Sequence, residues 1–434
     1  MTTLAPENKA PERATTSGVG KKKPAGSGYE SPDGRPTILG FTWLGAIFKP
    51  APFMVGALIG FIVCCFLGYQ TTLKNQFGDI KRFGVMVGPQ ASFFPTFRQL
   101  LAVVKSRVKH GETLVIVGGS SILNGVGQSN EDLWTNRLQE KLGPKYVVVN
   151  LALRSCSTFE AAYFVAEAMT MQYDKVIFVT GALPFANWHP TGMWPYAYLY
   201  WDAKYNDMLP AYPERDRAIA DREKTLPDAA WTKDAYTELQ LSQLLNSKLH
   251  FLELWNTVGY RYFFTSYRNA TADMSFLPRK KLPNNIEAYE KFMPPDEKFA
   301  KTYFPAVCGV LYNWDEAKKQ WVKNQSAWDI SETTIRQNAA PCMRNRMLTL
   351  LVYQNPDMRH KYLTPTQLKR DRMAYDESQR QLSKFGIHSL QIGEDYKGED
   401  FRDAQHFSPS GGNKMADQTA AAVREMAKQL GYEQ

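Results

Sequence analysis

The stretch TLVIVGGSS, residues 113–121, decides the fold class of this chain. Its first five residues form a short apolar run of the kind that makes a strand buried on both faces. Gly118 and Gly119 follow and allow the backbone to turn sharply where the strand ends. Ser120 and Ser121 then lead through Ile-Leu-Asn-Gly toward a helix. The pattern predicts the first strand and turn of an α/β unit.

Four further apolar runs follow and alternate with stretches of helical spacing. The runs lie at 146–150, 175–180, 347–353 and 387–392, and the helical stretches at 132–142, 158–171, 364–385 and 412–430. Strands that alternate with helices form right-handed crossovers and a parallel sheet covered on both faces. We therefore predict a three-layer α/β domain from residues 112–189 and 346–434. Between its halves, residues 190–345 are rich in Trp, Tyr and Pro, and we expect an insertion subdomain or lid over the carboxyl edge of the sheet.

The N-terminal part has a different composition. Residues 1–48 are predicted to be a disordered tail, poor in aliphatic side chains up to residue 36, followed by an interfacial segment. Residues 52–70 begin with PFMVGALIGFIVCCFLGY, an uncharged run long enough for the roughly 30 Å of hydrocarbon in a bilayer. We expect one transmembrane helix there, then a stalk at 71–111.

The formal net charge of +9 is concentrated in short runs such as 21–23. This triple lysine favours an N-terminus inside the cytoplasm and places the larger part outside it, in a single-pass protein of the inner or plasma membrane. The sequence has no basic stripe interleaved with aromatic residues, no zinc-finger spacing and no helix-turn-helix signature, which argues against nucleic-acid binding. Metal-ligand spacing is absent as well, so neither a metal nor a cofactor is expected.

The five cysteines are too few for a disulfide framework. Cys64 and Cys65 lie within the apolar run. Of the other three, Cys308 and Cys342 are the plausible pair in an oxidising compartment, because both belong to the predicted insertion. Cys156 is either a small buried residue in a tight turn, which is the more ordinary interpretation, or a catalytic cysteine.

Candidate catalytic residues follow the first and last predicted strands, where parallel sheets bind their ligands. Ser120 follows the first strand, and DAQHFSPSG, which begins at Asp403, follows the last. A carboxylate three residues before His406 can accept the proton of Nδ1, which leaves Nε2 to take a proton from a serine. Taken singly, the first pattern could be a glycine turn and the second a surface hydrogen bond. A phosphate-binding loop would require a Gly-Lys-Ser/Thr ending, which is missing.

Together, the Gly-x-Ser turn, Asn150 at the end of the second strand and the HFSPSG continuation of Asp-x-x-His resemble the SGNH (GDSL-like) hydrolase superfamily. The resemblance covers residues 112–185 and 346–430. It implies that Ser120 is the nucleophile, His406 the general base and Asp403 the residue that orients His406.

The resemblance also implies an oxyanion hole formed by the backbone N–H groups of Ser120 and Ser155. Members of the superfamily add an asparagine just after a glycine at the tip of the third strand. Here that tip reads TGALP, residues 180–184, with no asparagine. Asn187 or Thr180 would have to substitute for it.

An aromatic-rich stretch follows this tip and suggests where a substrate would bind. Trp188, His189 and Trp194, with the aromatic residues at 196–201, resemble a sugar-binding wall, although such residues more often serve packing.

Anchored proteins that this chain resembles, of the alginate and teichoic-acid O-acylation types, act on acyl groups of cell-envelope or exported polysaccharides, often beside a multi-span acyltransferase partner. The resemblance therefore implies a membrane-anchored serine esterase or O-acyltransferase that handles acyl, above all acetyl, esters of a glycan through a seryl acyl-enzyme. The alternatives are a non-catalytic assembly or binding subunit, which the missing asparagine favours, and a lipid esterase or thioesterase.

Overall fold

The computed structural model describes residues 53–60, 62–63, 97–109, 111–129, 131–153, 156–182, 198–225 and 292–433. The chain divides into two units, residues 1–63 and 64–434. In the first unit the described residues are helical and expose large apolar side chains, including Phe53, Leu58 and Ile62. Among the residues described, no helix is both long and apolar enough to cross a bilayer. The remainder of the predicted span and residues 1–48 lie outside the described ranges.

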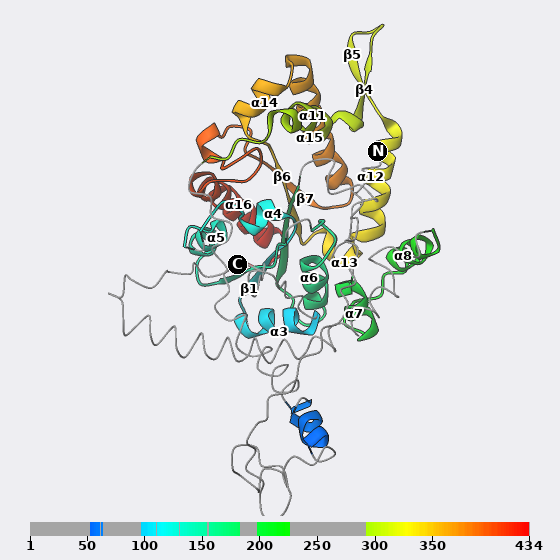
Figure 1. The fold of residues 1–434 in the computed structure, drawn as a ribbon, viewed down its shortest axis with the longest axis vertical. Coiled ribbons are helices and arrows are strands. Elements are labelled where there is room, and N and C mark those ends of the chain that lie inside the picture. Colours follow the sequence, from blue (N-terminus) through cyan, green and yellow to red (C-terminus); the bar gives the residue numbers. More distant parts are fainter. Residues whose placement is uncertain are drawn as a thin grey trace, which may run out of the picture. The chain divides into compact units, whose positions relative to one another are not determined.

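Five parallel strands form the central sheet of the second unit, as predicted. Their order is β2-β1-β3-β6-β7 (Figure 1). The strands are β1 (Thr113–Val117), β2 (Tyr146–Asn150), β3 (Val176–Ala182), β6 (Met347–Val352) and β7 (His388–Ile392). Every neighbouring pair is parallel, which confirms the predicted α/β class. Because the order reverses between β1 and β3, their carboxyl ends flank the position where doubly wound sheets bind ligands.

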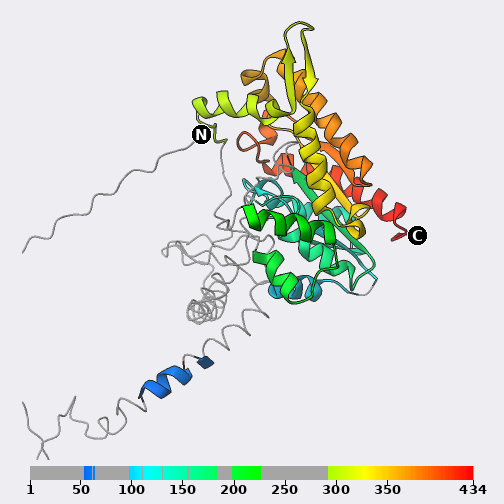
Figure 2. The same cartoon turned by 90° about the vertical axis from the view of Figure 1, so that its right-hand side faces the viewer.

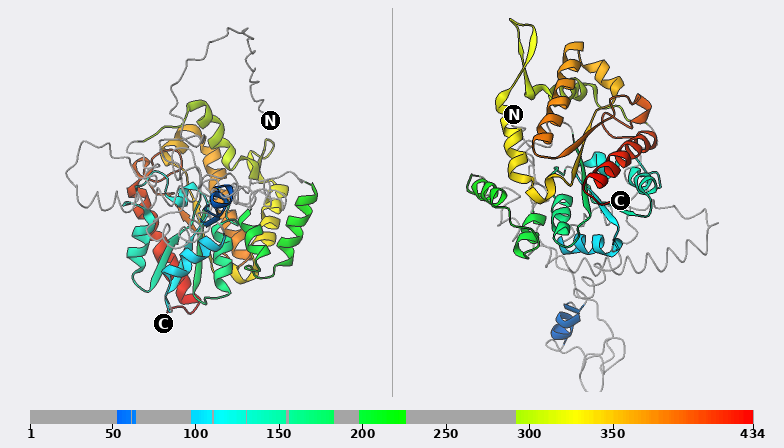
Figure 3. Two further views of the ribbon diagram at one scale, coloured as in Figure 1. Left: turned by 60° about the horizontal axis from the view of Figure 1, so that its bottom comes forward. Right: turned by 180° about the vertical axis from the view of Figure 1, so that it is seen from behind.

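Helices cover both faces of the sheet. Alternate residues of β1 enter different cores: Val115 and Val117 pack on one side, and Leu114 and Ile116 on the other. The first core contains buried side chains of α4 (Ser121–Asn124), α5 (Trp134–Leu142) and α16 (Pro409–Gln429). The second contains side chains of α3 (Phe97–Arg107), α6 (Ala162–Thr170), α12 (Gln325–Asn338) and α15 (Pro365–Lys384). The two sets lie on opposite sides of the sheet (Figures 1 and 3).

The predicted stalk ends earlier than expected. Residues 97–107 form α3, whose Phe97, Leu100 and Val104 side chains are buried in the second core. The backbone N–H of Phe97 donates to Asp202 at 2.6 Å, which joins α3 to α7 (Tyr198–Tyr205). This helix therefore belongs to the α/β domain.

The described parts of residues 190–345 also pack against the domain. Tyr200 of α7, Ile219 of α8 (Pro213–Thr225) and Trp328 of α12 all enter the second core. A short helix, α13 (Pro341–Arg344), then leads into β6. The hairpin of β4 (Tyr312–Asp315) and β5 (Gln320–Lys323) follows the 3₁₀ turn η3 (Gly309–Leu311). Its base is anchored by Tyr312, which is buried in the second core, and its far end projects from the layers (Figures 1 and 2).

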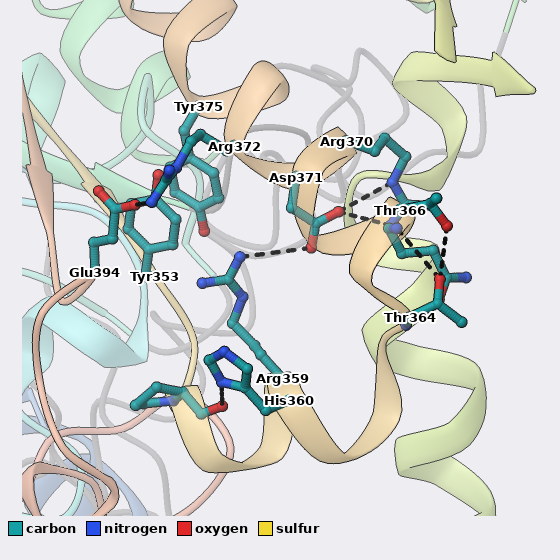
Figure 4. Close-up of polar contacts among 12 residues, drawn as sticks. Tyr353, Arg359, His360, Thr364, Thr366, Arg370, Asp371, Arg372, Tyr375 and Glu394 are labelled. Carbon is teal, nitrogen blue, oxygen red and sulfur yellow. Dashed lines mark hydrogen bonds and ion pairs between the residues drawn. The ribbon is translucent and has the colours of Figure 1, made fainter. Parts of the chain in front are cut away.

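A buried ionic network fixes α14 (Pro356–Tyr362) against α15. The guanidinium of Arg370 donates to Asp371 Oδ1 from Nη2 at 2.7 Å and from Nε at 3.0 Å (Figure 4). On the other side of this carboxylate, Nη2 of Arg359 lies 4.0 Å from Oδ2, and its guanidinium covers the Tyr353 ring at 4.8 Å. Tyr353 in turn stacks on Tyr375. Arg359 thereby holds α14 against α15.

The proposed pairing of Cys308 with Cys342 is wrong. Both thiols are free. Cys308 is buried in the second core after α11 (Glu297–Val307), whereas Cys342 is exposed on α13 with its Sγ 4.0 Å from Thr170 Oγ1. Sequence proximity in one insertion does not bring two Cβ atoms into disulfide geometry.

Cys156 is a buried residue of the loop after β2, as its ordinary interpretation predicted. Burial, and then the charge of Glu160, raises the pKa of its thiol well above the usual value. A thiol that resists ionisation is a poor nucleophile. Cys156 therefore serves packing.

Candidate active site

Two glycines shape the turn that carries the serines out of β1. A Cβ on Gly118 would lie 2.6 Å from the Phe178 ring and 2.7 Å from Ala162 Cβ, so no side chain fits there. Gly119 has φ +99°, a conformation that glycine adopts without strain. Ser120 then occupies the N-cap of α4, and Ser121 is the first residue of this helix.

The second part of the site is the turn at residues 401–407, which we call the histidine loop. An antiparallel bridge joins Phe401 to Phe407, and the N–H of Arg402 donates to the carbonyl of His406 at 2.7 Å. Within this loop, Asp403 Oδ1 accepts the backbone N–H groups of Gln405 at 2.9 Å and His406 at 2.8 Å. Its Oδ2 lies 2.7 Å from His406 Nδ1. The Asp-x-x-His spacing thus folds as predicted, with the carboxylate against the ring.

The serine that meets the imidazole is Ser121. Its Oγ lies 2.8 Å from His406 Nε2, and the two residues are 285 positions apart in the chain. The predicted contact of His406 with Ser120 is therefore wrong by one residue. Successive residues at the start of a helix point in directions about 100° apart, so only one of two adjacent serines can face a given partner. Nothing in the sequence of two identical residues indicates where α4 begins.

The site is partly screened from solvent. The His406 side chain is 13% exposed and that of Asp403 22%. Burial would raise the pKa of Asp403, but the hydrogen bond and charge of His406, with the two backbone N–H donors, outweigh it and hold this pKa below its usual value. The carboxylate is thus ionised at neutral pH and suited to stabilise an imidazolium.

The start of α16 packs against the histidine loop, and this packing accounts for the sequence SPSGG at residues 408–412. Ser408 is the N-cap residue, and its Oγ also donates to the carbonyl of Glu399 at 2.9 Å. A Cβ on Gly411 would approach the Asp400 carbonyl to 2.1 Å, and one on Gly412 would approach Gln128 Nε2 to 2.4 Å. Gly411 is therefore required for close packing of the helix, because a backbone carbonyl cannot move aside, whereas a side chain at Gly412 would displace the Gln128 amide.

Asp400 ties the loop to α16. It ends the 3₁₀ turn η4 (Gly398–Asp400), and its buried carboxylate accepts bonds from Ser410 Oγ at 2.7 Å, Lys414 Nζ at 2.6 Å and the Lys397 N–H at 2.9 Å. Burial would raise the pKa of Asp400, but these donors, Lys414 first, lower it below its usual value.

We expect Asp400→Asn to reduce the free energy of unfolding by about 2 kcal/mol at pH 7, because the amide lacks the charge that Lys414 pairs with. A carboxyl group with a lowered folded pKa stabilises the fold above its unfolded pKa of about 4 and loses this contribution as the pH falls through the folded value. The difference between variant and wild type should therefore begin to narrow near pH about 4 and close only when the pH falls below the lowered folded pKa. Urea titrations at pH 7 and pH 3 measure it, and an equal difference at both values would contradict the assignment.

Several predicted site residues lie outside the described ranges. These are Ser155 and Asn187 of the oxyanion hole, and Trp188, His189 and Trp194 of the substrate wall. Further along that wall, Tyr200 and Trp201 are buried in the second core, as the packing alternative predicts. Thr180 is described and fully buried on β3. Its hydroxyl lies beside Gly119: a Cβ added to Gly119 would be 3.1 Å from Thr180 Oγ1.

The structure adds two residues that the sequence analysis did not identify. Asn355, the N-cap of α14, donates its N–H to the Ala404 carbonyl at 2.9 Å and its Nδ2 to the Asp403 carbonyl at 3.4 Å. Tyr303 of α11 donates its hydroxyl to Gln405 Oε1 at 2.7 Å. No motif marks either residue, because both act through long-range contacts.

Metal ligands do not cluster within the described ranges, where no group of three His, Cys, Asp or Glu side chains could hold an ion. No protein-family model matches the sequence, and no curated protein matches it either.

Proposed function

We propose that this protein is a serine esterase or O-acyltransferase of the SGNH type. The observation that carries the proposal is the continuous path from Asp403 Oδ2 to His406 Nδ1 at 2.7 Å and from His406 Nε2 to Ser121 Oγ at 2.8 Å. The location of this path supports it, since Ser121 follows β1 at the switch point of the sheet. The strand order β2-β1-β3-β6-β7 is also that of flavodoxin-like sheets.

In the proposed reaction, Ser121 Oγ attacks the carbonyl carbon of an ester while His406 Nε2 takes the hydroxyl proton. The tetrahedral intermediate collapses as His406 returns this proton to the departing alkoxide, leaving an acyl group on Ser121. Water or a sugar hydroxyl then attacks the acyl carbon, and the same imidazole removes its proton. The second tetrahedral intermediate collapses by breaking the bond to Ser121 Oγ, which takes the proton back from His406 and releases the free acid or the acylated sugar. Asp403 keeps Nδ1 protonated and Nε2 facing the serine.

The oxyanion would be bound at the start of α4. First-turn N–H groups of a helix have no carbonyl acceptor within the helix, so the N–H groups of Ser121 and Ile122 make no hydrogen bond inside α4. They lie at the N-terminal end of α4, which is the positive end of the helix dipole. The contribution assigned from the sequence to the N–H of Ser120 therefore moves to Ser121. Ser155 and Asn187 stay as predicted further donors. Each such donor lowers the barrier by roughly 3 to 4 kcal/mol.

For the substrate we propose acetyl esters of a cell-envelope or exported polysaccharide, handled beside a multi-span acyltransferase. This part rests on the resemblance and on the uncharged run at 52–70, which we propose to anchor the chain by one helix with its N-terminus in the cytoplasm. A lipid esterase or thioesterase uses the same chemistry and differs in its preference for long acyl chains.

The proposal is tested with full-length protein in detergent, treated with a fluorophosphonate probe and, separately, with acetylated polysaccharide. We expect the probe to label Ser121. After treatment with acetylated polysaccharide and rapid acid quench, we expect the tryptic peptide that contains Ser121 to carry one acetyl group. Transfer to an oligosaccharide identifies a transferase, and release of acetate alone an esterase. Faster turnover of long-chain than of acetyl esters would favour the lipid esterase. A folded protein that takes up neither label would be the non-catalytic assembly subunit.

A further inference from the structure

The helix α11, from the long stretch between β3 and β6, contacts the histidine loop at three successive points. The N–H of Met293, just before this helix, donates to the Arg402 carbonyl at 2.7 Å. Ala300 and Phe304 pack with Ala404 in a small separate core. Tyr303, between them, donates its hydroxyl to Gln405 Oε1 at 2.7 Å. The contacts therefore bracket Asp403 and reach the residue next to His406.

The Tyr303 hydroxyl is suited to hold this position. Its ring is fixed by stacking on Phe299 at 5.0 Å and by an edge contact with Phe304 at 5.6 Å. Burial raises the pKa of Tyr303 to about 12, so the hydroxyl keeps the proton that it donates. Its acceptor belongs to Gln405, whose N–H also binds Asp403 Oδ1. Movement of Gln405 would therefore disturb the carboxylate that orients the imidazole.

We propose that Tyr303 is a positioning residue, through which α11 holds Gln405 and thereby aligns Asp403 and His406 with Ser121. The histidine loop is then supported from two sides, by Asn355 at the N-cap of α14 and by Tyr303 from α11. In this arrangement α11 controls the reactivity of Ser121 by holding the histidine loop in place. The effect on catalysis rests on the proposed function, whereas the effect on the order of the loop does not.

The test compares two tyrosine-to-phenylalanine variants of the full-length protein. Tyr303→Phe keeps the ring contacts and removes the bond to Gln405, together with the contact of the Gln354 side chain with the same hydroxyl. Tyr396→Phe is the matched control, because the Tyr396 hydroxyl also donates to a glutamine Oε1, that of Gln418 on α16, at 2.9 Å. Its ring packs against Phe401 and Phe407, so the control lies equally close to the loop.

The first measurement is amide hydrogen exchange in peptides that cover residues 402–407. Loss of one hydrogen bond is expected to speed exchange at Gln405 and His406 by about threefold to tenfold in Tyr303→Phe and to leave it unchanged in Tyr396→Phe. The second is ester hydrolysis, where we expect kcat to fall by about the same factor with KM unchanged. Tyr303→Phe with Gln405→Met should show no further loss, because both remove the same bond.

The positioning role would be overturned if amide exchange at residues 402–407 were as slow in Tyr303→Phe as in wild type. It would also be overturned if exchange were accelerated equally in Tyr303→Phe and Tyr396→Phe. If exchange responds but wild-type protein neither hydrolyses esters nor takes up the probe, the proposed function fails and the support of the loop stands. If wild-type protein reacts and neither exchange nor kcat responds to Tyr303→Phe, only the positioning role fails.

Discussion

Ser121→Ala is expected to lower the rate of ester hydrolysis and of fluorophosphonate labelling by about 10⁴-fold or more, because it removes the only hydroxyl placed on His406 Nε2 in the described part of the chain. Ser120→Ala should retain most of the activity. Ser120 is the N-cap of α4, but its side chain makes no capping hydrogen bond, so its loss has little effect on the helix. The measurement is the rate of probe labelling for both variants beside wild type.

This pair of variants separates the two serines directly. Thermal melting of both proteins shows whether the fold is kept, which the partial exposure of both residues leads us to expect. An inactive Ser120→Ala protein beside an active Ser121→Ala protein would reverse the assignment and restore the one made from sequence. Equal, moderate losses in both would mean that neither serine is the nucleophile.

Arg215→Met is expected to destabilise the fold by about 3 to 5 kcal/mol, the usual effect of removing one partner of a buried ion pair. Arg215 Nη1 lies 2.6 Å from Glu167 Oε2, and their side chains are 2% and 0% exposed. The guanidinium also lies over three aromatic rings at 5.5 to 5.6 Å, those of Phe164, Tyr200 and Tyr212. Urea unfolding at pH 7 measures the loss.

The pH dependence of this variant follows from Glu167. Burial raises the pKa of Glu167, and the charge of Arg215 opposes that shift. Without Arg215 the carboxyl group binds its proton more tightly when folded than when unfolded. Stability of the variant should then increase as the pH falls toward the unfolded pKa, and the difference from wild type should shrink.

Two controls isolate the buried charge as the cause. The double variant Glu167→Met with Arg215→Met should recover most of the stability, because no charge is then left without a partner. Lys224→Met removes one member of an exposed pair on the same helix, with Asp221, and should change stability by less than about 0.5 kcal/mol. A double variant as unstable as Arg215→Met alone would show that packing, rather than charge, explains the loss.

The regular part of the fold was predictable from the sequence. The apolar runs at 113–117 and 146–150 coincide with β1 and β2, because strands buried on both faces need uninterrupted apolar residues. The ends of other elements depend on tertiary contacts. For example, β3 continues to Ala182 because Gly181 and Ala182 pair with β6, and α16 begins at Pro409 because Ser408 serves as its N-cap.

The candidate site was predictable in part. Asp403 and His406 are three residues apart, and local geometry alone brings them together. The choice between Ser120 and Ser121 depends on the residue at which a helix of only four residues begins, and hydrophobic periodicity gives no information over so short a length. Tyr303 and Asn355 were missed for another reason: they contact the histidine loop from α11 and from the N-cap of α14, and only the folded chain shows such contacts.

The distance in sequence between Ser121 and His406 has a consequence for biosynthesis. The hydroxyl emerges from the ribosome early, while the base that would activate it is translated 285 residues later. During that interval the serine is an ordinary alcohol, unable to capture acyl groups from metabolites around the nascent polypeptide. Reactivity would begin only when the final strand and helix have docked, so the proposed enzyme is protected from acylation of its unfinished form.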